Sequence, residues 1–113
     1  RMLKLGTVAV VVRDEKKAAK WYREKLGMRL VDKWDHWHTV ATRGGDVKIH
    51  LCPDSKPEKG NTGILFWTKD CRKEEAALRK KGVKITTPAT KEDWGTYLMF
   101  ADPDGNEFWV MQA

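Results

Sequence analysis

The sequence predicts an α+β domain built from two consecutive βαβββ modules, which form a curved mixed sheet around a cavity. Two observations support this prediction. The same order of strand, capped helix and short strands occurs twice in the 113 residues, and each copy takes up close to half of the chain. Neither copy could bury both faces of its own small sheet, so the two sheets must pair to close a core, which leaves a concave cavity between them. We place module one at 2–52, a connector at 53–62 and module two at 63–113, all within one domain spanning 1–113.

The first module begins with a Val-rich strand, Leu3–Val12. Asp14 is placed to cap a helix over Lys16–Leu26, because a short carboxylate accepts hydrogen bonds from the free amides of a first turn. Gly27 ends this helix, as a left-handed C-terminal glycine does. Three short strands follow, at Arg29–Lys33, Trp37–Thr42 and Val47–Cys52.

The second module repeats this pattern after a connector that is rich in proline and polar residues. Gly63–Thr68 is the strand, Asp70 the cap, Cys71–Lys81 the helix and Gly82 its end. The remaining strands are predicted at Val83–Thr86, Trp94–Ala101 and Glu107–Met111, and the Asp104-Gly105 turn joins the last two into a hairpin.

Composition limits the classes of function. The net charge is +6, but the basic residues share both helices with acidic ones, which is typical of solvated helix faces. No basic motif interleaved with aromatic residues is present, so nucleic-acid binding is not expected. The longest apolar run, Val8–Val12, is too short to span a membrane.

The two cysteines, Cys52 and Cys71, lack CxxC spacing, which favours a reduced, cytoplasmic protein. Cys71 opens a helix, so it is either a thiol of lowered pKa or a plain helix residue.

Three stretches resemble the vicinal-oxygen-chelate superfamily, which includes glyoxalases, bleomycin-resistance proteins and extradiol dioxygenases. VAVVVRDEKKAAKWYREKLGMRL looks like its opening strand and helix, and LRKKGVKI looks like the end of its second helix. FADPDGNEFWVMQ is similar to its closing hairpin and is the most specific of the three. The resemblance implies the glyoxalase/bleomycin-resistance/dioxygenase fold and a homodimer, whose modules pair either within a chain or by exchange between chains.

Metal-dependent members of this superfamily draw ligands from the first and last strand of each module, which correspond here to Thr7, His50, Gly63 and Glu107. The ion chelates neighbouring substrate oxygens and stabilises the charge that develops on them. Glu107 matches the superfamily, and His50 is a competent ligand. A threonine hydroxyl is a poor ligand, and glycine has no side chain, so the metal set is incomplete.

Strand parity places the candidate residues on shared faces. Lys48 and His50 share one face of their predicted strand, and Glu107 and Trp109 share one face of theirs. Thr7 shares a face with Ala9 and Val11, and Trp67 shares one with Gly63 and Leu65. If the superfamily arrangement holds, these faces line the cavity, with Trp94 beside its mouth. Aromatic walls suit planar or apolar ligands. The alternative is that the tryptophans fill the core or a dimer interface.

His36 and His38 form a second candidate cluster. They are two residues apart, so on a strand they point the same way, and such a pair can bind zinc. The superfamily draws no ligand from this strand, and a turn followed by an exposed strand face fits the same residues.

The leading prediction is therefore a small-molecule-binding protein with an aromatic cavity, in which Thr7, Lys48, Trp67, Trp94 and Trp109 contact the ligand. Its positive charge favours a neutral or anionic organic ligand over a cationic one. No cofactor is firmly implied. The alternative is a metal-dependent lyase, isomerase or dioxygenase, in which His50 and Glu107 hold weakly bound Zn, Ni, Mn or Fe and Glu107 is catalytic. Whether the protein is an enzyme stays open.

Overall fold

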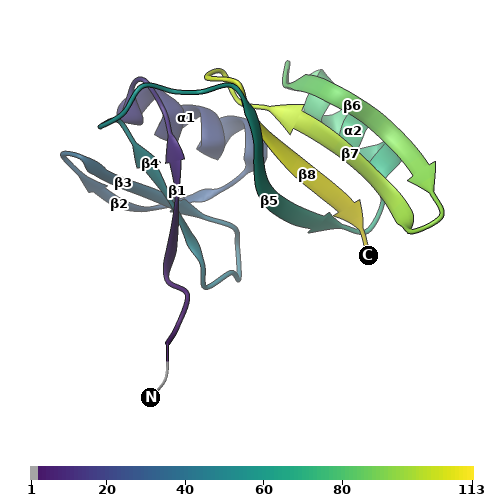
Figure 1. Cartoon of the computed structure of the whole chain (residues 1–113), viewed down its shortest axis with the longest axis horizontal. Coiled ribbons are helices and arrows are strands. Elements are labelled where there is room, and N and C mark those ends of the chain that lie inside the picture. Colours follow the sequence, from purple (N-terminus) through teal and green to yellow (C-terminus); the bar gives the residue numbers. More distant parts are fainter. Residues whose placement is uncertain (1–2) are drawn as a thin grey trace. The chain divides into compact units, whose positions relative to one another are not determined.

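The computed structural model describes residues 3–113. The predicted start of the first module, Met2, lies outside this range. The chain divides into two compact units, Arg1–Pro57 and Glu58–Ala113. Within the described part, each unit contains one four-stranded mixed sheet and one helix (Figure 1). The predicted α+β class and the duplicated βαβββ order are therefore confirmed.

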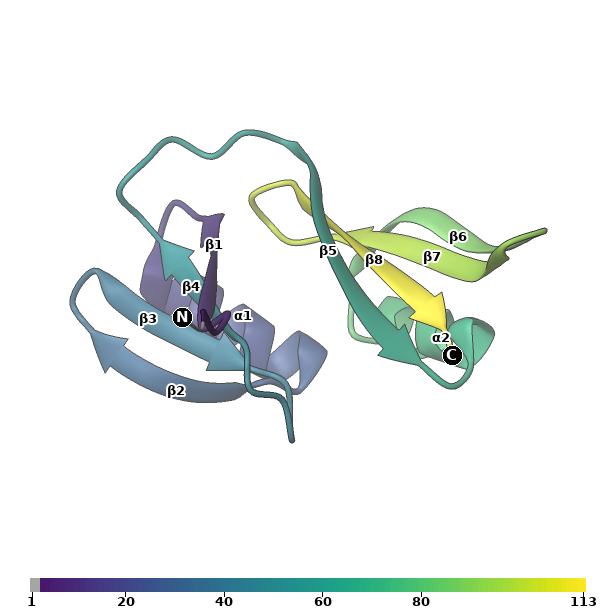
Figure 2. The same cartoon turned by 60° about the horizontal axis from the view of Figure 1, so that its bottom comes forward.

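In the first unit, α1 (Glu15–Leu26) follows the short strand β1 (Thr7–Val11). The other strands are β2 (Arg29–Trp34), β3 (Trp37–Ala41) and β4 (Lys48–Cys52). The spatial order is β1-β4-β3-β2, and only the β1–β4 pair is parallel (Figure 2). Parallel pairing of β1 and β4 requires a long connection, which the helix and the β2–β3 hairpin provide.

The second unit repeats this topology with the order β5-β8-β7-β6, in which only β5 and β8 are parallel. Its elements are β5 (Gly60–Thr68), α2 (Cys71–Lys80), β6 (Lys84–Glu92), β7 (Gly95–Ala101) and β8 (Asn106–Gln112).

The predicted helix boundaries have the expected physical causes. Asp14 accepts a hydrogen bond from the Lys17 amide at 3.0 Å, and Asp70 accepts from the amides of Arg72 and Lys73. Gly27 adopts the left-handed conformation with φ of 66°, which costs glycine no steric clash.

Strand β6 is much longer than the predicted Val83–Thr86. It continues to Glu92 past Pro88, and its pairing with β7 shifts register at Thr87 and again before Thr90. Proline is tolerated there because β6 is an edge strand and the irregular pairing does not require its missing amide.

The core of the second unit lies between its sheet and α2. Phe66, Phe100 and Phe108 form a mutual ring cluster with centroid separations of 5.3 to 6.2 Å. Cys71 is fully buried, and burial raises the pKa of its thiol, with Asp70 and Glu74 adding to the effect. The alternative of a lowered thiol pKa is therefore wrong, and Cys71 is a core residue of the helix.

The DPDGN stretch has a structural role at the β7–β8 turn. One carboxylate oxygen of the buried Asp102 accepts from the amides of Asp104 and Asn106, and the other accepts from the Asn106 side chain. This network fixes where β8 starts, and hence which side of the sheet Glu107 faces.

None of the helices within residues 3–113 has the length and apolar character needed to cross a bilayer.

Candidate functional site

In each unit, one face of the sheet packs on the helix, and on β4 and β8 the side chains of the opposite face are partly exposed. Strand β8 shows this alternation clearly, because Phe108 and Val110 are buried while Glu107, Trp109 and Met111 are only half-buried. We call the sheet face opposite α2 the second open face, and the sheet face opposite α1 the first open face.

Three aromatic rings cluster on the second open face. The Tyr97 ring lies 5.0 Å from that of Trp94 and 5.1 Å from that of Trp109, between centroids. The two indoles are 6.5 Å apart and steeply inclined to each other, at 64°. These separations fall in the range where aromatic rings attract one another, so the cluster is a preformed aromatic surface.

This surface is open to solvent and extends towards β5. Trp94 is 59% exposed and Trp67 is 69% exposed. Trp67 pairs in register with Met111, and Leu65 pairs with Trp109. Exposed apolar side chains that neighbour one another on a sheet face are typical of binding surfaces.

Glu107 lies beside the aromatic cluster. Its neighbours across the sheet are Asn61 on β5 and Ala101 on β7. Its backbone carbonyl accepts from the Thr62 hydroxyl at 2.8 Å. Within residues 3–113 its carboxylate forms no hydrogen bond or ion pair, so it is available as an acceptor for a ligand.

The first open face carries Thr7, Lys48 and His50. Thr7 and Lys48 are register partners on β1 and β4. The Lys48 ammonium lies 3.2 Å from the Asp32 carboxylate, which also accepts from the Thr39 hydroxyl. The hydrogen bond from Thr39 is the largest cause that lowers the pKa of Asp32, and the hydrogen bond from Lys48 is the next. Lys48 is thus held by a protein carboxylate, which reduces its freedom to contact a ligand.

His50 is also engaged. Its ring packs on that of Trp37, with centroids 4.3 Å apart, and its Nε2 lies 3.1 Å from the carbonyl oxygen of His36. A carbonyl only accepts hydrogen bonds, so Nε2 must carry the proton and donate. Only Nδ1 of His50 is then free to act as a metal ligand.

The residues at the predicted metal positions do not fit a catalytic ion. Among residues 3–113, no group of three His, Cys, Asp or Glu side chains could hold a metal. Gly63 contributes no ligand atom and Thr7 only a neutral hydroxyl, whereas catalytic zinc takes three protein ligands. The structure describes His50 and Glu107 in different units, each on an open face.

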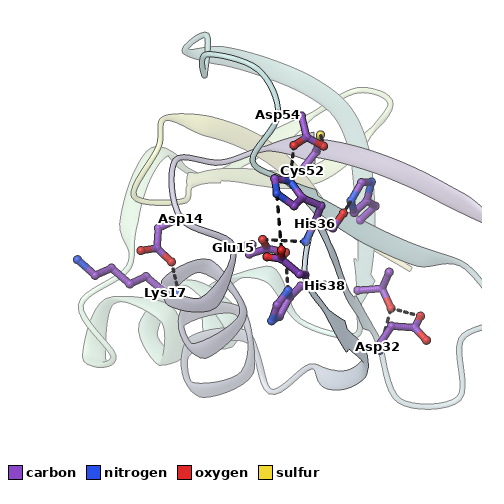
Figure 3. A network of polar contacts seen from close by, with 11 residues as sticks. Asp14, Glu15, Lys17, Asp32, His36, His38, Cys52 and Asp54 are labelled. Atoms are coloured by element: carbon purple, nitrogen blue, oxygen red, sulfur yellow. Dashed lines mark hydrogen bonds and ion pairs between the residues drawn. The ribbon is translucent and has the colours of Figure 1, made fainter.

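The His36/His38 pair is a structural network instead of a shared zinc site (Figure 3). Both histidines contact Glu15 of α1: the His36 amide donates to one carboxylate oxygen at 3.1 Å, and the His38 Nδ1 lies 2.5 Å from the other. The His36 ring turns to Asp54, at 2.5 Å. His38 is buried, so the prediction of an exposed strand face is wrong there, and Glu15 is not part of a solvated helix face.

His36 has the left-handed φ of 60° in the β2–β3 turn, which is uncommon for a residue other than glycine. Its amide, its carbonyl and its ring each have a partner, in Glu15, His50 and Asp54. These three contacts hold the turn in this conformation.

The hydrogen bond to Asp54, aided by the charges of Asp54, Asp35 and Glu15, raises the pKa of His36 above its ordinary 6.5. Because the pKa of His36 is raised in the folded state, the stabilisation that its protonated ring contributes is fully present below about pH 6.5. It is lost as the pH rises through the pKa of the folded state.

We expect Asp54→Asn to lower the His36 pKa in an NMR titration of the imidazole resonances. Asp46→Asn, which removes the same charge from the β3–β4 loop, should leave it unchanged. An unaltered His36 pKa in Asp54→Asn would contradict the assigned pair.

Sequence reasoning missed two residues beside the predicted site. Tyr97 links Trp94 to Trp109, and the hairpin register together with strand parity could have placed it on the Trp109 face. Asn61 falls in the predicted connector, yet its side-chain oxygen accepts from the Trp109 indole N–H at 3.1 Å. No sequence signal revealed this contact, because it depends on an irregularity in β5.

Comparison with known proteins gives concordant results. The model of the Glyoxalase/Bleomycin resistance protein/Dioxygenase superfamily matches residues 4–110. The YetH protein of Bacillus subtilis (strain 168) is 30% identical, over 92% of this chain and 93% of its own length.

Solved structures are similar over nearly the full length. A superfamily member from Sphaerobacter thermophilus DSM 20745 has a TM-score of 0.88 and 27% identity, with 99% of this chain and 98% of that chain covered. TnmS3, an antibiotic binding protein from Streptomyces sp. CB03234, has a TM-score of 0.87 and 30% identity, with 98% and 96% covered.

Proposed function

Because the chain belongs to the Glyoxalase/Bleomycin resistance protein/Dioxygenase superfamily, we propose that it binds a planar aromatic small molecule on the second open face. The observation that carries this proposal is the Trp94–Tyr97–Trp109 cluster, with Trp67 exposed on the same sheet. A flat ring system can stack on one ring of this cluster, contact the others at their edges and bury apolar surface that the free protein leaves in water. The similar TnmS3 is an antibiotic binding protein, which supports a binding role.

The ligand is neutral or anionic in this proposal. The net charge of +6 raises the local concentration of anions and disfavours cations. Glu107 contributes as an acceptor for a ligand hydroxyl or N–H group. The prediction that Thr7 and Lys48 contact a ligand on the first open face is separate from this proposal and stays a prediction. The homodimer implied by the resemblance also stays a prediction, which sedimentation velocity would measure.

Titration with fluorene-2-carboxylate, a planar anion, tests the proposal by tryptophan fluorescence. We expect saturable quenching that EDTA does not alter, because no metal takes part. Cyclohexanecarboxylate has the same charge without an aromatic ring and should produce no saturable quenching. Equal responses to both anions, or none to either, would contradict the proposal.

The metal-dependent alternative rests on the free carboxylate of Glu107 and on His50. We expect Zn²⁺, Ni²⁺, Mn²⁺ or Fe²⁺ to leave the melting temperature unchanged, because the donor set does not fit a catalytic ion. Selective binding to the folded state would raise the melting temperature. A rise in the wild type that disappears in both Glu107→Ala and His50→Ala would overturn this expectation and support a lyase, isomerase or dioxygenase.

A further inference from the structure

Strand β5 contains a bulge where it runs beside Glu107 and Trp109. Asn61 pairs with Glu107 and Leu65 pairs with Trp109, so residues 62–64 lie opposite Phe108 alone. Gly63 adopts the left-handed conformation with φ of 76°. Bulges re-aim side chains and occur often next to binding sites.

The bulge is held by side-chain hydrogen bonds. The Thr62 hydroxyl donates to the Glu107 carbonyl at 2.8 Å and accepts from the Ile64 amide at 3.1 Å. The Asn61 Oδ1 accepts from the Gly63 amide at 2.8 Å. These bonds replace ladder bonds that the irregular segment cannot form.

The same Asn61 oxygen accepts from the Trp109 Nε1 at 3.1 Å. Both partners are N–H donors, so the atom that faces them must be the oxygen of the amide and not its nitrogen. Two donors occupy both lone pairs of this oxygen. Asn61 therefore fixes the orientation of the Trp109 indole and cannot accept a further hydrogen bond through Oδ1.

The Asn61 amino group keeps its two donors free. Asn61 is exposed, and within residues 3–113 its Nδ2 forms no hydrogen bond. The residue thus presents N–H donors beside the indole that it orients. Such donors recognise an acceptor atom on a ligand that stacks on this ring.

We propose that Asn61 is both a positioning residue for Trp109 and a specificity-determining residue, which selects planar aromatic ligands that carry a carbonyl oxygen. This inference rests on the proposed function, because it names the class of ligand that the aromatic cluster takes. A carbonyl at the edge of the stacked ring system accepts from Asn61, while the ring system stacks on Trp109 and contacts the steeply inclined Trp94 at its edge.

A matched pair of probes tests the selectivity. Fluorenone-2-carboxylate and fluorene-2-carboxylate have the same charge and nearly the same shape, but only the first has a ketone oxygen. We expect the wild type to bind the ketone about tenfold more tightly, the value of one good hydrogen bond. Calorimetry would give both dissociation constants.

Two substitutions separate the roles of Asn61. Asn61→Asp keeps an oxygen acceptor for Trp109 and Gly63 but removes the N–H donors. The near-ultraviolet circular dichroism of the aromatic cluster should be retained and the ketone preference lost. Asn61→Leu removes acceptor and donors, so both the spectrum and the preference should change. Because both probes carry one negative charge, the charge that Asn61→Asp adds cancels from their affinity ratio.

The outcomes are distinguishable. If both probes bind the wild type equally, or if Asn61→Asp keeps the wild-type ketone preference, the selectivity of Asn61 is refuted while the aromatic site stands. An unchanged near-ultraviolet spectrum in Asn61→Leu would refute the positioning role. If neither probe binds the wild type, the proposed function fails and this inference fails with it.

Discussion

Trp109→Ala is expected to weaken binding of fluorene-2-carboxylate at least about 30-fold, which is the loss of about 2 kcal/mol typical of a central aromatic anchor. The substitution removes one of the two indoles of the ring cluster and leaves Tyr97 without one of its two indole neighbours. It also frees the Asn61 oxygen that the indole N–H occupies. Isothermal calorimetry suits this measurement, since it does not depend on the tryptophan that is removed.

Trp34→Ala is the control for this prediction. Trp34 is as exposed as any ring of the cluster, at 70%, but it lies at the end of β2 in the first unit. Its loss should change the dissociation constant by less than about twofold, because Trp34 is not part of the ring cluster and surface changes outside a binding site have small effects. If Trp34→Ala weakened binding as much as Trp109→Ala, the ligand would not be assigned to the second open face.

Phe108→Ala is expected to reduce the free energy of unfolding by about 3–5 kcal/mol, the usual cost of truncating a buried phenylalanine. Phe108 is completely buried and packs against both Phe66 and Phe100. Denaturation in urea, followed by far-ultraviolet circular dichroism, measures the change.

Phe108 and Trp109 are adjacent in sequence but lie on opposite faces of β8. Trp109→Ala should therefore lower stability by less than Phe108→Ala, while its effect on binding is larger. A cost below about 1 kcal/mol for Phe108→Ala would contradict the assignment of the core face, since full burial of an aromatic ring is worth more than that.

The pattern of helices, caps and hairpins could be predicted from sequence because each has a local cause. Asp14 and Gly27 sit at the ends of α1, and Asp104-Gly105 forms the last hairpin turn, as local hydrogen bonding and backbone freedom dictate. Strand parity also predicts that Glu107 and Trp109 share a face that Phe108 and Val110 do not, because side chains alternate along a strand.

Features that depend on tertiary partners could not be predicted in this way. Glu15 has the sequence context of a solvated helix residue, and its low exposure follows from His38 on another element. The bulge that brings Asn61 to Trp109 depends on the pairing of β5 with β8, which are far apart in the sequence. Strand β6 extends past Pro88 because its place at the sheet edge tolerates proline.

The most direct measurement of the central claim is an NMR titration that follows the indole N–H resonances of the six tryptophans as fluorene-2-carboxylate is added. We predict that the resonances of Trp94 and Trp109 shift and saturate together, while that of Trp21 on α1 stays in place. Stationary Trp94 and Trp109 resonances, with saturating shifts at Trp21 or Trp34, would contradict a ligand site on the face opposite α2.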